Sequence, residues 1–391
     1  MKHNFDEVVD RYNTYCTQWD YIQDRFGKAN ILPFSISDTD FKIPVEVYTQ
    51  LQKALEQQIY GYTRWNHHAF KSAITNYFQR RLHCTVQEDW IAYSPSVIYS
   101  LKVLLDILSK PKDGVFVLKP MYDAFFHVIE DNDRKLITSS LTCHNDKYEM
   151  DFVDMENKIK NAKVFLLCSP HNPTGKVFTK EELTKIVSLC KKYQIPIISD
   201  EIHMDVIMPN HTHHSMLSFL DTYEDIYVLS SGSKTFNFPS LIGSYACISN
   251  KEVYERFVHR TRHQDFVNSA SLLGIHATMS AYNECDYYVE ELVQYIYENF
   301  TYVKNFLEEH LPDIHFIMPQ ATYLAWIDCT NVPFSQDAIQ EALIHVGEVG
   351  IMRGEVYGQD KYLRLNCGCP RSKLEEGMQR VKKAMDSLYQ K

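Results

Sequence analysis

The chain has 391 residues, of which 45% are hydrophobic and 23% are charged, an ordinary balance for a globular protein long enough for two domains. Its formal net charge of -10 argues against nucleic acid and against an anionic membrane as partners. We expect a cytoplasmic protein with reduced thiols, because its ten cysteines lack a framework spacing, no apolar run approaches a membrane span and the polar N-terminus lacks the apolar core of a signal peptide.

Strand-like and helix-like segments alternate through the middle of the chain. Helix-like stretches such as 179–193, which has a threonine start signal and apolar residues at helical spacing, separate runs that resemble buried strands. These runs are 114–118, 163–169, 196–201, 225–231 and 244–249. Such alternation predicts an α/β fold, with a mostly parallel sheet between layers of helices.

The pattern changes after about residue 285. Long helix-like stretches are followed by the strand-like segments HFIM, TYLAWID and YLRLN, and a closing helix is expected from Ser372 onward. This part predicts a smaller α+β domain, completed by the first forty or so residues. We therefore divide the chain into a large domain at 46–284 and a small domain made of 1–45 plus 285–391.

Unusual residues follow three of the predicted strands. KVFLLCS runs into SPHNPTGKVF, PIIS runs into DEIHMDV, and DIYVL runs into SSGSKTF. A fourth segment, AYSPSVIYSLKVLLDIL, turns from a short strand into an apolar helix near Ser96. Because ligands bind beyond the carboxyl ends of strands in an open parallel sheet, these segments are predicted to surround one site.

Each of these signals also has an ordinary structural interpretation. The turn that begins at Asn172 can cap the next helix, Asp200 can be a helix N-cap, and a lone lysine such as Lys234 usually lies at the surface. Together they indicate one chemistry. An amine that forms a Schiff base, an acid that holds a pyridinium nitrogen and a phosphate cradle are the requirements of pyridoxal 5'-phosphate (PLP).

The motifs N-P-T-G, D-E-I-H and S-x-S-K, separated by 28 and 34 residues, resemble those of fold-type I PLP enzymes related to aspartate aminotransferase. Further segments resemble the MalY/PatB family of cystathionine and cysteine-S-conjugate β-lyases: SDTDF, IYGYT, KPMYDAFF, KTFNF, ATYLAWID and RLNCGCPR. The similarity runs from about residue 30 to the C-terminus. It implies a PLP-binding large domain with a mostly parallel sheet of the seven-stranded type, and carbon–sulfur lyase activity.

The resemblance implies a role for each matching residue around the cofactor ring. The catalytic residues are Lys234, Asp200 and Tyr122. Lys234 is the Schiff-base lysine, and Asp200 keeps the pyridine nitrogen protonated through its opposite charge. Asn172 and His203 lie where the family hydrogen-bonds the ring's phenolic oxygen, and Tyr122 stacks on the ring. His203 and Tyr122 could instead be ordinary core residues.

The resemblance places the phosphate at the N-terminus of the helix that starts near Ser96. The backbone N–H groups of Val97 and Ile98 would bind it, and Ser231 and Ser233 would add hydroxyl donors. Three departures from the family pattern concern this region. Ile242 stands where related aminotransferases have a phosphate-binding arginine, Ser96 stands where glycine is usual and permits a positive φ, and Pro239-Ser240 replaces small residues.

Substrate binding is expected from Arg364, Asn172 and Tyr60. Arg364 would grip the α-carboxylate as a bidentate fork, with a buried ion pair as the alternative. In the family the tyrosine at Tyr60 reaches the neighbour's PLP, so the resemblance implies a homodimer with shared active sites. Packing in the dimer interface is the alternative for Tyr60. We expect Phe34, Trp65 and Tyr323 to line the side-chain pocket.

A group of histidines and a pair of cysteines also lie close together in the sequence. The histidines of NHTHH at 210–214 lack neighbouring acids or cysteines, so we expect a solvated loop and no metal. Cys367 and Cys369 alternate along a predicted strand, which leaves a redox pair open as an alternative to plain thiols.

The resemblance predicts α,β-elimination, which yields a thiol, pyruvate and ammonia. An aminotransferase with the same site is the closest alternative, since both routes begin by removing the α-proton. A non-catalytic PLP or amino-acid sensor is a third candidate. The intact set of Lys234, Asp200 and Arg364 argues against it, because a binding module needs no base at Cα.

Overall fold

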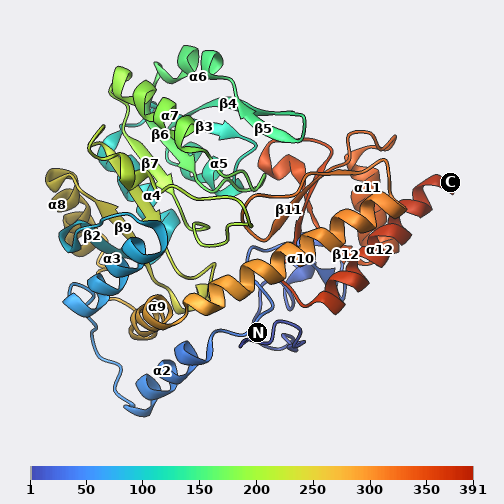
Figure 1. Cartoon of the computed structure of the whole chain (residues 1–391), viewed down its shortest axis with the longest axis horizontal. Helices are drawn as coiled ribbons and strands as arrows, with labels where there is room; N and C mark the ends of the chain where they lie inside the picture. Colours follow the sequence, from blue (N-terminus) through green and yellow to red (C-terminus); the bar gives the residue numbers. More distant parts are fainter. Residues whose placement is uncertain (1, 391) are drawn as a thin grey trace.

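The structure is a computed structural model that describes residues 2–390 (Figure 1). Within these residues the large sheet has eight strands in the order β2-β9-β8-β7-β6-β3-β4-β5. They are β2 (Ile91–Ser94), β3 (Gly114–Lys119), β4 (Lys135–His144), β5 (Lys147–Met150), β6 (Ala162–Cys168), β7 (Ile197–Asp200), β8 (Ile226–Ser230) and β9 (Ser244–Ile248). Of the described strands, β5 and β9 alone run against the other six, so the predicted mostly parallel sheet is confirmed.

All five predicted central strands form, as β3, β6, β7, β8 and β9. The sheet has one strand more than the seven-stranded type, because a hairpin at 135–150 adds β5 at the edge. Most residues of β4 are exposed or half-buried, whereas β6 to β9 are buried along nearly their whole length. The edge hairpin therefore lacks the continuous apolar run by which the central strands were predicted.

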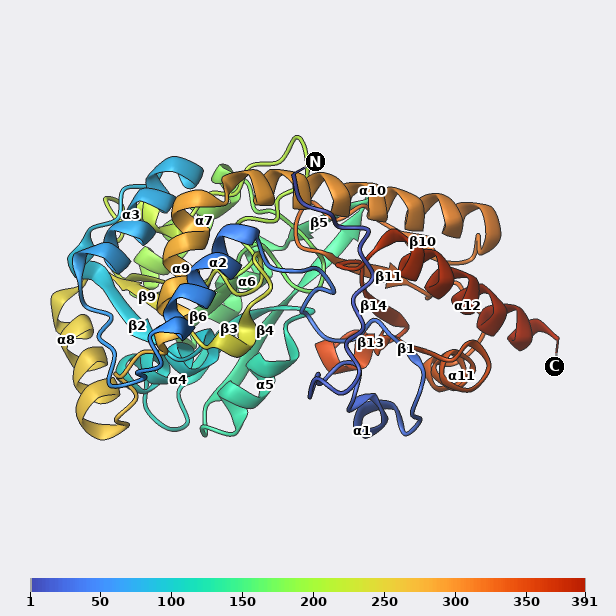
Figure 2. The same cartoon turned by 90° about the horizontal axis from the view of Figure 1, so that it is seen from below.

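Helices cover both faces of the large sheet. Figure 2 shows α4 (Val97–Leu108), α5 (Asp123–Glu130) and α8 (Lys251–His259) below the strands, and α7 (Lys180–Tyr193) above them. Helix α6 (Phe152–Ile159) packs beside α7, while α2 (Val45–Glu56) and α3 (His68–Leu82) both pack on α9 (Leu272–Glu284). The short helical turns are η1 (Glu88–Trp90), η2 (Met216–Phe219), η3 (Pro239–Leu241) and η4 (Arg260–Gln264).

The predicted start of α7 shows how local sequence determines a helix. Thr179 accepts the N–H of Glu182, and the Glu182 carboxylate accepts the N–H of Thr179, which satisfies two N–H groups that the helix itself leaves unpaired. The residues at helical spacing face the sheet and are buried: Leu183, Ile186, Val187 and Cys190. Capping and apolar spacing therefore agree on the same helix.

A smaller region follows the long helix α10 (Asp286–His310), which runs from the large sheet to the far end of the molecule (Figure 1). In the described chain its antiparallel sheet has the order β10-β11-β14-β13, and a second pair joins β1 to β12. The strands are β1 (Leu32–Pro33), β10 (His315–Phe316), β11 (Leu324–Asp328), β12 (Val349–Gly350), β13 (Met352–Arg353) and β14 (Tyr362–Asn366). Its helices are α1 (Ile22–Phe26), α11 (Gln336–Ala342), η5 (Leu343–Gly347), η6 (Gly354–Tyr357) and α12 (Arg371–Tyr389).

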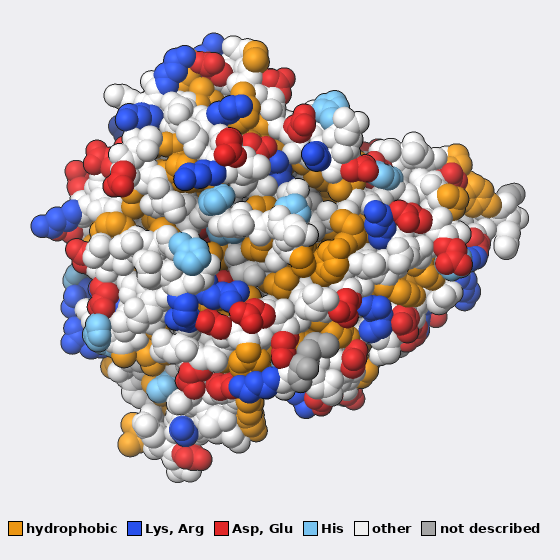
Figure 3. Space-filling model, viewed as in Figure 1, with side chains coloured by type: hydrophobic (Ala, Val, Ile, Leu, Met, Phe, Trp, Pro, Cys, Tyr) orange, Lys and Arg blue, Asp and Glu red, His pale blue; other side chains and the backbone are white. Residues whose placement is uncertain are grey.

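Both small sheets thus draw their strands from the chain ends, consistent with a small domain of 1–45 plus 285–391, which we propose together with the large domain at 46–284. Lys, Arg, Asp and Glu side chains are interspersed over the face in Figure 3. Among residues 2–390, no helix combines the length and the apolar character that crossing a membrane requires.

Candidate active site

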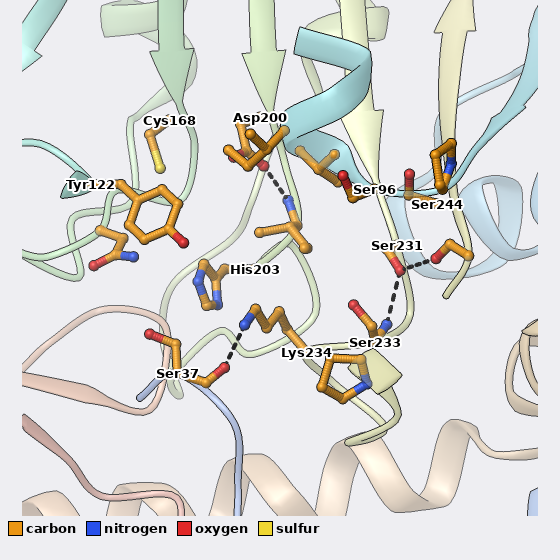
Figure 4. Close-up of a pocket in the computed structure, with 17 residues that line it drawn as sticks. Ser37, Ser96, Tyr122, Cys168, Asp200, His203, Ser231, Ser233, Lys234 and Ser244 are labelled. Carbon is orange, nitrogen blue, oxygen red and sulfur yellow. Dashed lines mark hydrogen bonds between the residues drawn. The ribbon is translucent and has the colours of Figure 1, made fainter. Parts of the chain in front are cut away.

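A cavity lies where β6, β7 and β8 end, beside the N-terminus of α4 (Figure 4). Its volume is about 200 Å³. Nine of the eleven predicted site residues, all within the described chain, line it: Val97, Ile98, Tyr122, Asn172, Asp200, His203, Ser231, Ser233 and Lys234. The parallel strands bring them together, because their carboxyl ends meet at one edge of the sheet.

Lys234 projects into the cavity from the turn that follows β8 (Figure 4). Its Nζ donates a hydrogen bond to the carbonyl oxygen of Ser37 at 2.5 Å. Burial lowers the pKa of the Lys234 amine, and the nearby positive charge of Arg364 acts in the same direction. The alternative of a surface lysine is therefore wrong, and the amine is one that loses its proton more easily than a solvated lysine.

Asp200 ends β7 and is 5% exposed. Its Oδ1 accepts the N–H of Ile202 at 3.1 Å, so it caps a turn; no helix begins there. Burial raises the pKa of the Asp200 carboxyl to about 7, while the charge of Lys234 opposes this shift. A positive group at the carboxyl would therefore stabilise its ionised form.

His203 and Tyr122 lie on the wall of the cavity (Figure 4). Burial lowers the pKa of His203 to about 3, which keeps the ring neutral. Its Nδ1 is buried and has no hydrogen-bond partner among residues 2–390. Burial also raises the pKa of the Tyr122 hydroxyl to about 12, so this aromatic ring stays uncharged at neutral pH.

The N-terminus of α4 faces the same cavity. The Ser96 hydroxyl accepts the N–H of Tyr99 at 3.1 Å, and the N–H groups of Val97 and Ile98 have no partner within the helix. Ser96 has a φ of -155°, so serine in place of glycine causes no strain there. An anion at this helix end would meet free N–H donors and the positive end of the helix dipole.

The serines after β8 differ in their availability. The Ser231 hydroxyl donates to the carbonyl oxygen of Gly243 at 2.6 Å and accepts the N–H of Ser233.

Ile242 is half-exposed, has a φ of +55° and does not line the cavity. Among the described residues, Lys234 is therefore the one cationic side chain on the cavity wall.

Arg364 lies on β14 and is 4% exposed. Its Nη1 donates to Asn172 Oδ1 at 3.2 Å, its Nη2 donates to the carbonyl oxygen of Ser35 at 3.0 Å, and its guanidinium lies over the Tyr357 ring. Nε is buried without a partner, and no carboxylate in the described chain forms an ion pair with it. The alternative of a structural ion pair is therefore wrong: among residues 2–390 this buried charge has two hydrogen-bond acceptors and an aromatic face but no carboxylate partner.

Two predicted residues are not on the cavity wall: Arg364 lies behind it, bonded to the wall residue Asn172, whereas Tyr60 has no hydrogen bond to any wall residue among residues 2–390. Tyr60 is 60% exposed in the segment after α2, and its hydroxyl donates to the carbonyl oxygen of Leu55 at 2.9 Å. Its neighbours Ile59 and Tyr62 are also exposed. Within one subunit, Tyr60 contributes nothing to the cavity wall.

The cavity also contains residues to which the sequence assigned no role, among them Ser37, Cys168 and Ser244, although Ser37 begins the SDTDF segment. Cys168 ends β6, so the rule that located Asp200 on β7 would also have located it. Of the expected pocket residues, Phe34 packs against Gly377 and Trp65 joins the hydrophobic core. Tyr323 lies nearer, since its hydroxyl donates to Ser37 O at 2.9 Å.

The histidine loop at 210–214 is not fully solvated as predicted. His213 is 6% exposed, and its Nε2 lies 3.2 Å from Oε2 of the buried Glu201. In the part of the chain that the structure describes, no group of three His, Cys, Asp or Glu side chains is arranged to hold a metal ion. Cys367 and Cys369 are buried free thiols whose pKa values burial raises.

Most of the chain matches one known protein family. The profile of the family Aminotransferase class I and II matches residues 29–381. The chain belongs to this family.

Its relatives within the aminotransferase class I and II family define a narrower group. Protein MalY of Escherichia coli is 38% identical over 96% of this chain and 97% of its own length. Cystathionine beta-lyase PatB of Bacillus subtilis is 31% identical over 98% of this chain and 100% of its own. The structure of cystalysin from Treponema denticola, which contains PLP, matches with a TM-score of 0.94 at 30% identity and covers 99% of this chain and 100% of that one. The protein is a PLP-dependent enzyme of the MalY/PatB C–S lyase group with the fold-type I architecture.

The cavity residues fit PLP. Buried polar atoms are almost always hydrogen-bonded, so the unpartnered Nδ1 of His203 indicates a ligand atom beside it. The free N–H groups at the start of α4 suit a phosphate, the buried Asp200 carboxyl suits a protonated ring nitrogen, and the amine of Lys234 suits an aldehyde. These groups line one cavity, as a single cofactor requires.

The lowered pKa of Lys234 predicts how PLP uptake by the apoprotein depends on pH. The neutral amine is the form that attacks an aldehyde, and a lowered pKa makes it available at lower pH. We expect the rate of PLP incorporation to rise with pH and to level off with a midpoint below the ordinary lysine pKa of about 10.4. Stopped-flow absorbance measures this rate, with free Nα-acetyl-lysine as the reference amine. A midpoint equal to that of the reference would contradict the assignment of a desolvated amine.

Proposed function

We propose that this protein is a PLP-dependent carbon–sulfur β-lyase. It cleaves cystathionine or another cysteine S-conjugate into a thiol, pyruvate and ammonia by α,β-elimination. The observation that carries the proposal is the guanidinium of Arg364, which has no carboxylate partner among residues 2–390 and is buried beside the cavity that Lys234 and Asp200 line. A substrate α-carboxylate would give this charge its partner, which favours an amino acid as the substrate class.

Residues of the chain itself bind the substrate and transfer its Cα proton. Arg364 holds the α-carboxylate, and Asn172, which accepts a hydrogen bond from Arg364, helps to orient the same end of the substrate. When bound, PLP supplies an electron sink for the charge that develops at Cα. The Nζ of Lys234 removes the proton from Cα, a task for which a lowered pKa suits an amine near neutral pH.

The remaining cavity residues hold the cofactor in place. Asp200 stays ionised against the ring nitrogen, because that positive charge lowers the pKa that burial has raised. Neutral His203 and Asn172 hydrogen-bond the phenolic oxygen, and Tyr122 packs against the ring. The N–H groups of Val97 and Ile98 would bind the phosphate, with help from the Ser233 hydroxyl; the Ser231 hydroxyl would have to leave the carbonyl oxygen of Gly243 before it could donate to the phosphate.

Elimination is favoured over amino transfer by the relatives. PatB is named a cystathionine beta-lyase, and it aligns over nearly the whole of both chains. An aminotransferase is the second candidate, because the family also contains an aspartate aminotransferase, 21% identical over 93% of this chain. Both reactions need the same base and the same carboxylate clamp. They differ in whether a leaving group is present at Cβ.

An assay of products separates the candidates. With L-cystathionine or an S-alkyl cysteine, we expect stoichiometric thiol and pyruvate, measured by a thiol reagent and by lactate dehydrogenase coupling. With alanine and an α-keto acid, amino transfer should be slower by orders of magnitude. Predominant formation of a new amino acid would identify an aminotransferase, and PLP binding without either product would identify a sensor.

We also propose a homodimer in which Tyr60 acts on the partner's cofactor. Fold-type I PLP enzymes are typically obligate dimers. Ile59, Tyr60 and Tyr62 form an exposed apolar segment, which suits burial against a second copy of the chain. A phenol donor from the partner would also supplement the phosphate site, where Lys234 is the one cationic wall residue of the described chain.

The variant Tyr60→Phe should retain PLP about tenfold more weakly while remaining dimeric, because one hydrogen bond to a charged group is lost. Dialysis against a PLP-free buffer measures retention, and sedimentation measures the dimer. Mixing Tyr60→Ala with Lys234→Ala chains tests the shared site. A heterodimer then has one site with both lesions and one intact site, so activity should return. Heterodimers without recovered activity would show that Tyr60 acts within its own subunit.

A further inference from the structure

Asp205 is a buried carboxylate that the proposed chemistry does not use. It lies in the same turn as His203, is 6% exposed and does not line the cavity that Lys234 enters. It faces a separate cavity of about 400 Å³. A buried carboxylate is costly unless hydrogen bonds satisfy it, so its contacts indicate what it does.

Both oxygens of Asp205 accept hydrogen bonds from hydroxyl groups. Oδ1 accepts from Tyr77 at 2.8 Å, and Oδ2 accepts from Thr235 at 2.8 Å. Thr235 is fully buried and is the residue directly after Lys234. One oxygen of Asp205 therefore holds the backbone turn from which the amine of Lys234 extends.

The other oxygen is anchored in rigid core. Tyr77 lies on α3 and stacks on Tyr282 of α9, with ring centroids 4.0 Å apart and planes 8° from parallel. The Tyr282 hydroxyl in turn lies 2.9 Å from that of Tyr245 on β9. This aromatic cluster fixes Asp205 independently of the cofactor cavity.

Lys234 needs such support because its own side chain is held weakly. Four rotatable bonds separate Cα from Nζ, and the hydrogen bond found for Nζ in the described chain is the one to Ser37 O. The preceding turn, SSGS, contains Gly232, whose backbone is the most easily deformed. The place of Nζ therefore depends on how firmly the backbone at 234–235 is fixed.

We infer that Asp205 is a positioning residue for Lys234. Its hydrogen bond to the Thr235 hydroxyl joins the turn that carries Lys234 to the turn that carries His203. Because the two turns are held together, Nζ of Lys234 keeps the same position relative to the cavity wall in every turnover. This inference rests on the proposed role of Lys234. A small misplacement of a reacting group can lower the rate by up to about 100-fold, so loss of the Asp205–Thr235 hydrogen bond should have a measurable effect on turnover.

Thr235 provides matched variants for the test. Thr235→Val removes the hydroxyl and keeps the shape, Thr235→Ser keeps the hydroxyl, and Tyr77→Phe removes the other hydrogen bond to the same carboxylate. We expect Thr235→Val to lower kcat about tenfold with little change in KM and to shift the pH midpoint of the bound cofactor's absorbance. Thr235→Ser should match the wild type in both. Tyr77→Phe loosens the anchor of the same carboxylate, so it should lower kcat in the same direction as Thr235→Val but by a smaller factor.

Two results with the Thr235 variants would overturn the inference. If Thr235→Val lowers Tm while kcat and the absorbance midpoint stay at wild-type values, Asp205 has a structural role alone. If Thr235→Ser behaves like Thr235→Val, the hydroxyl bond is not the cause. The absorbance titration requires bound cofactor but no particular reaction, so it tests the inference even if the wild-type enzyme proves to be an aminotransferase. Borohydride labelling of a lysine other than Lys234 would instead refute the proposed role and the inference with it.

Discussion

Lys234→Ala should reduce turnover of cysteine conjugates by at least about 10³-fold and leave PLP bound weakly. The amine lies inside the cofactor cavity with a lowered pKa, and the proposed mechanism uses it both to attach PLP and to move the proton at Cα. Its loss therefore removes two functions at once. Steady-state kinetics and the visible absorbance of the purified variant measure both effects.

The attachment site provides the control for this prediction. The wild-type holoenzyme should be yellow, and borohydride should fix the cofactor to the peptide that contains Lys234. Lys234→Arg keeps the positive charge but cannot form the reducible link, so it should be as inactive as Lys234→Ala. Cofactor found on another lysine, or a variant with wild-type turnover, would show that the site is wrongly assigned.

Arg364→Ala should lower kcat/KM for cysteine conjugates roughly 30- to 150-fold, which corresponds to a loss of about 2–3 kcal/mol of transition-state stabilisation. The guanidinium is buried without a carboxylate partner among residues 2–390, and its Nε has no hydrogen-bond partner there. KM should rise, because binding of the α-carboxylate is lost. The visible spectrum should not change, since Arg364 is expected to contact the substrate and not the cofactor.

Arg364→Lys is the matched control, because it retains the charge but loses the planar fork. We expect its kcat/KM to lie between those of the wild type and of Arg364→Ala. Substrates without an α-carboxylate, such as S-substituted cysteamines, should be insensitive to both changes. Normal kinetics in Arg364→Ala would mean that another group holds the carboxylate.

The main strands and several site residues could be predicted because their signals are local. Runs of buried residues marked β3, β6, β7, β8 and β9, and the rule that ligands bind at strand ends located Asp200 and Lys234. The hairpin of β4 and β5 gave no comparable signal, since its residues are largely exposed at the edge of the sheet. Tyr60 shows a different limit, because nothing within one subunit places it at the cavity.

The amino-acid sequence by itself determined the α/β class, the PLP chemistry and the order of the catalytic motifs, since periodicity, capping and strand-end residues act over short distances along the chain. Only the tertiary structure decided which groups meet across it. Ser37 lies 197 residues from Lys234, and its carbonyl oxygen accepts a hydrogen bond from the lysine amine. Arg364 lies 192 residues from Asn172, to which it donates a hydrogen bond. The Asp205–Thr235 bond spans 30 residues and joins two turns at the ends of neighbouring strands. Such contacts depend on how whole elements pack, and packing is a property of the folded chain as a whole.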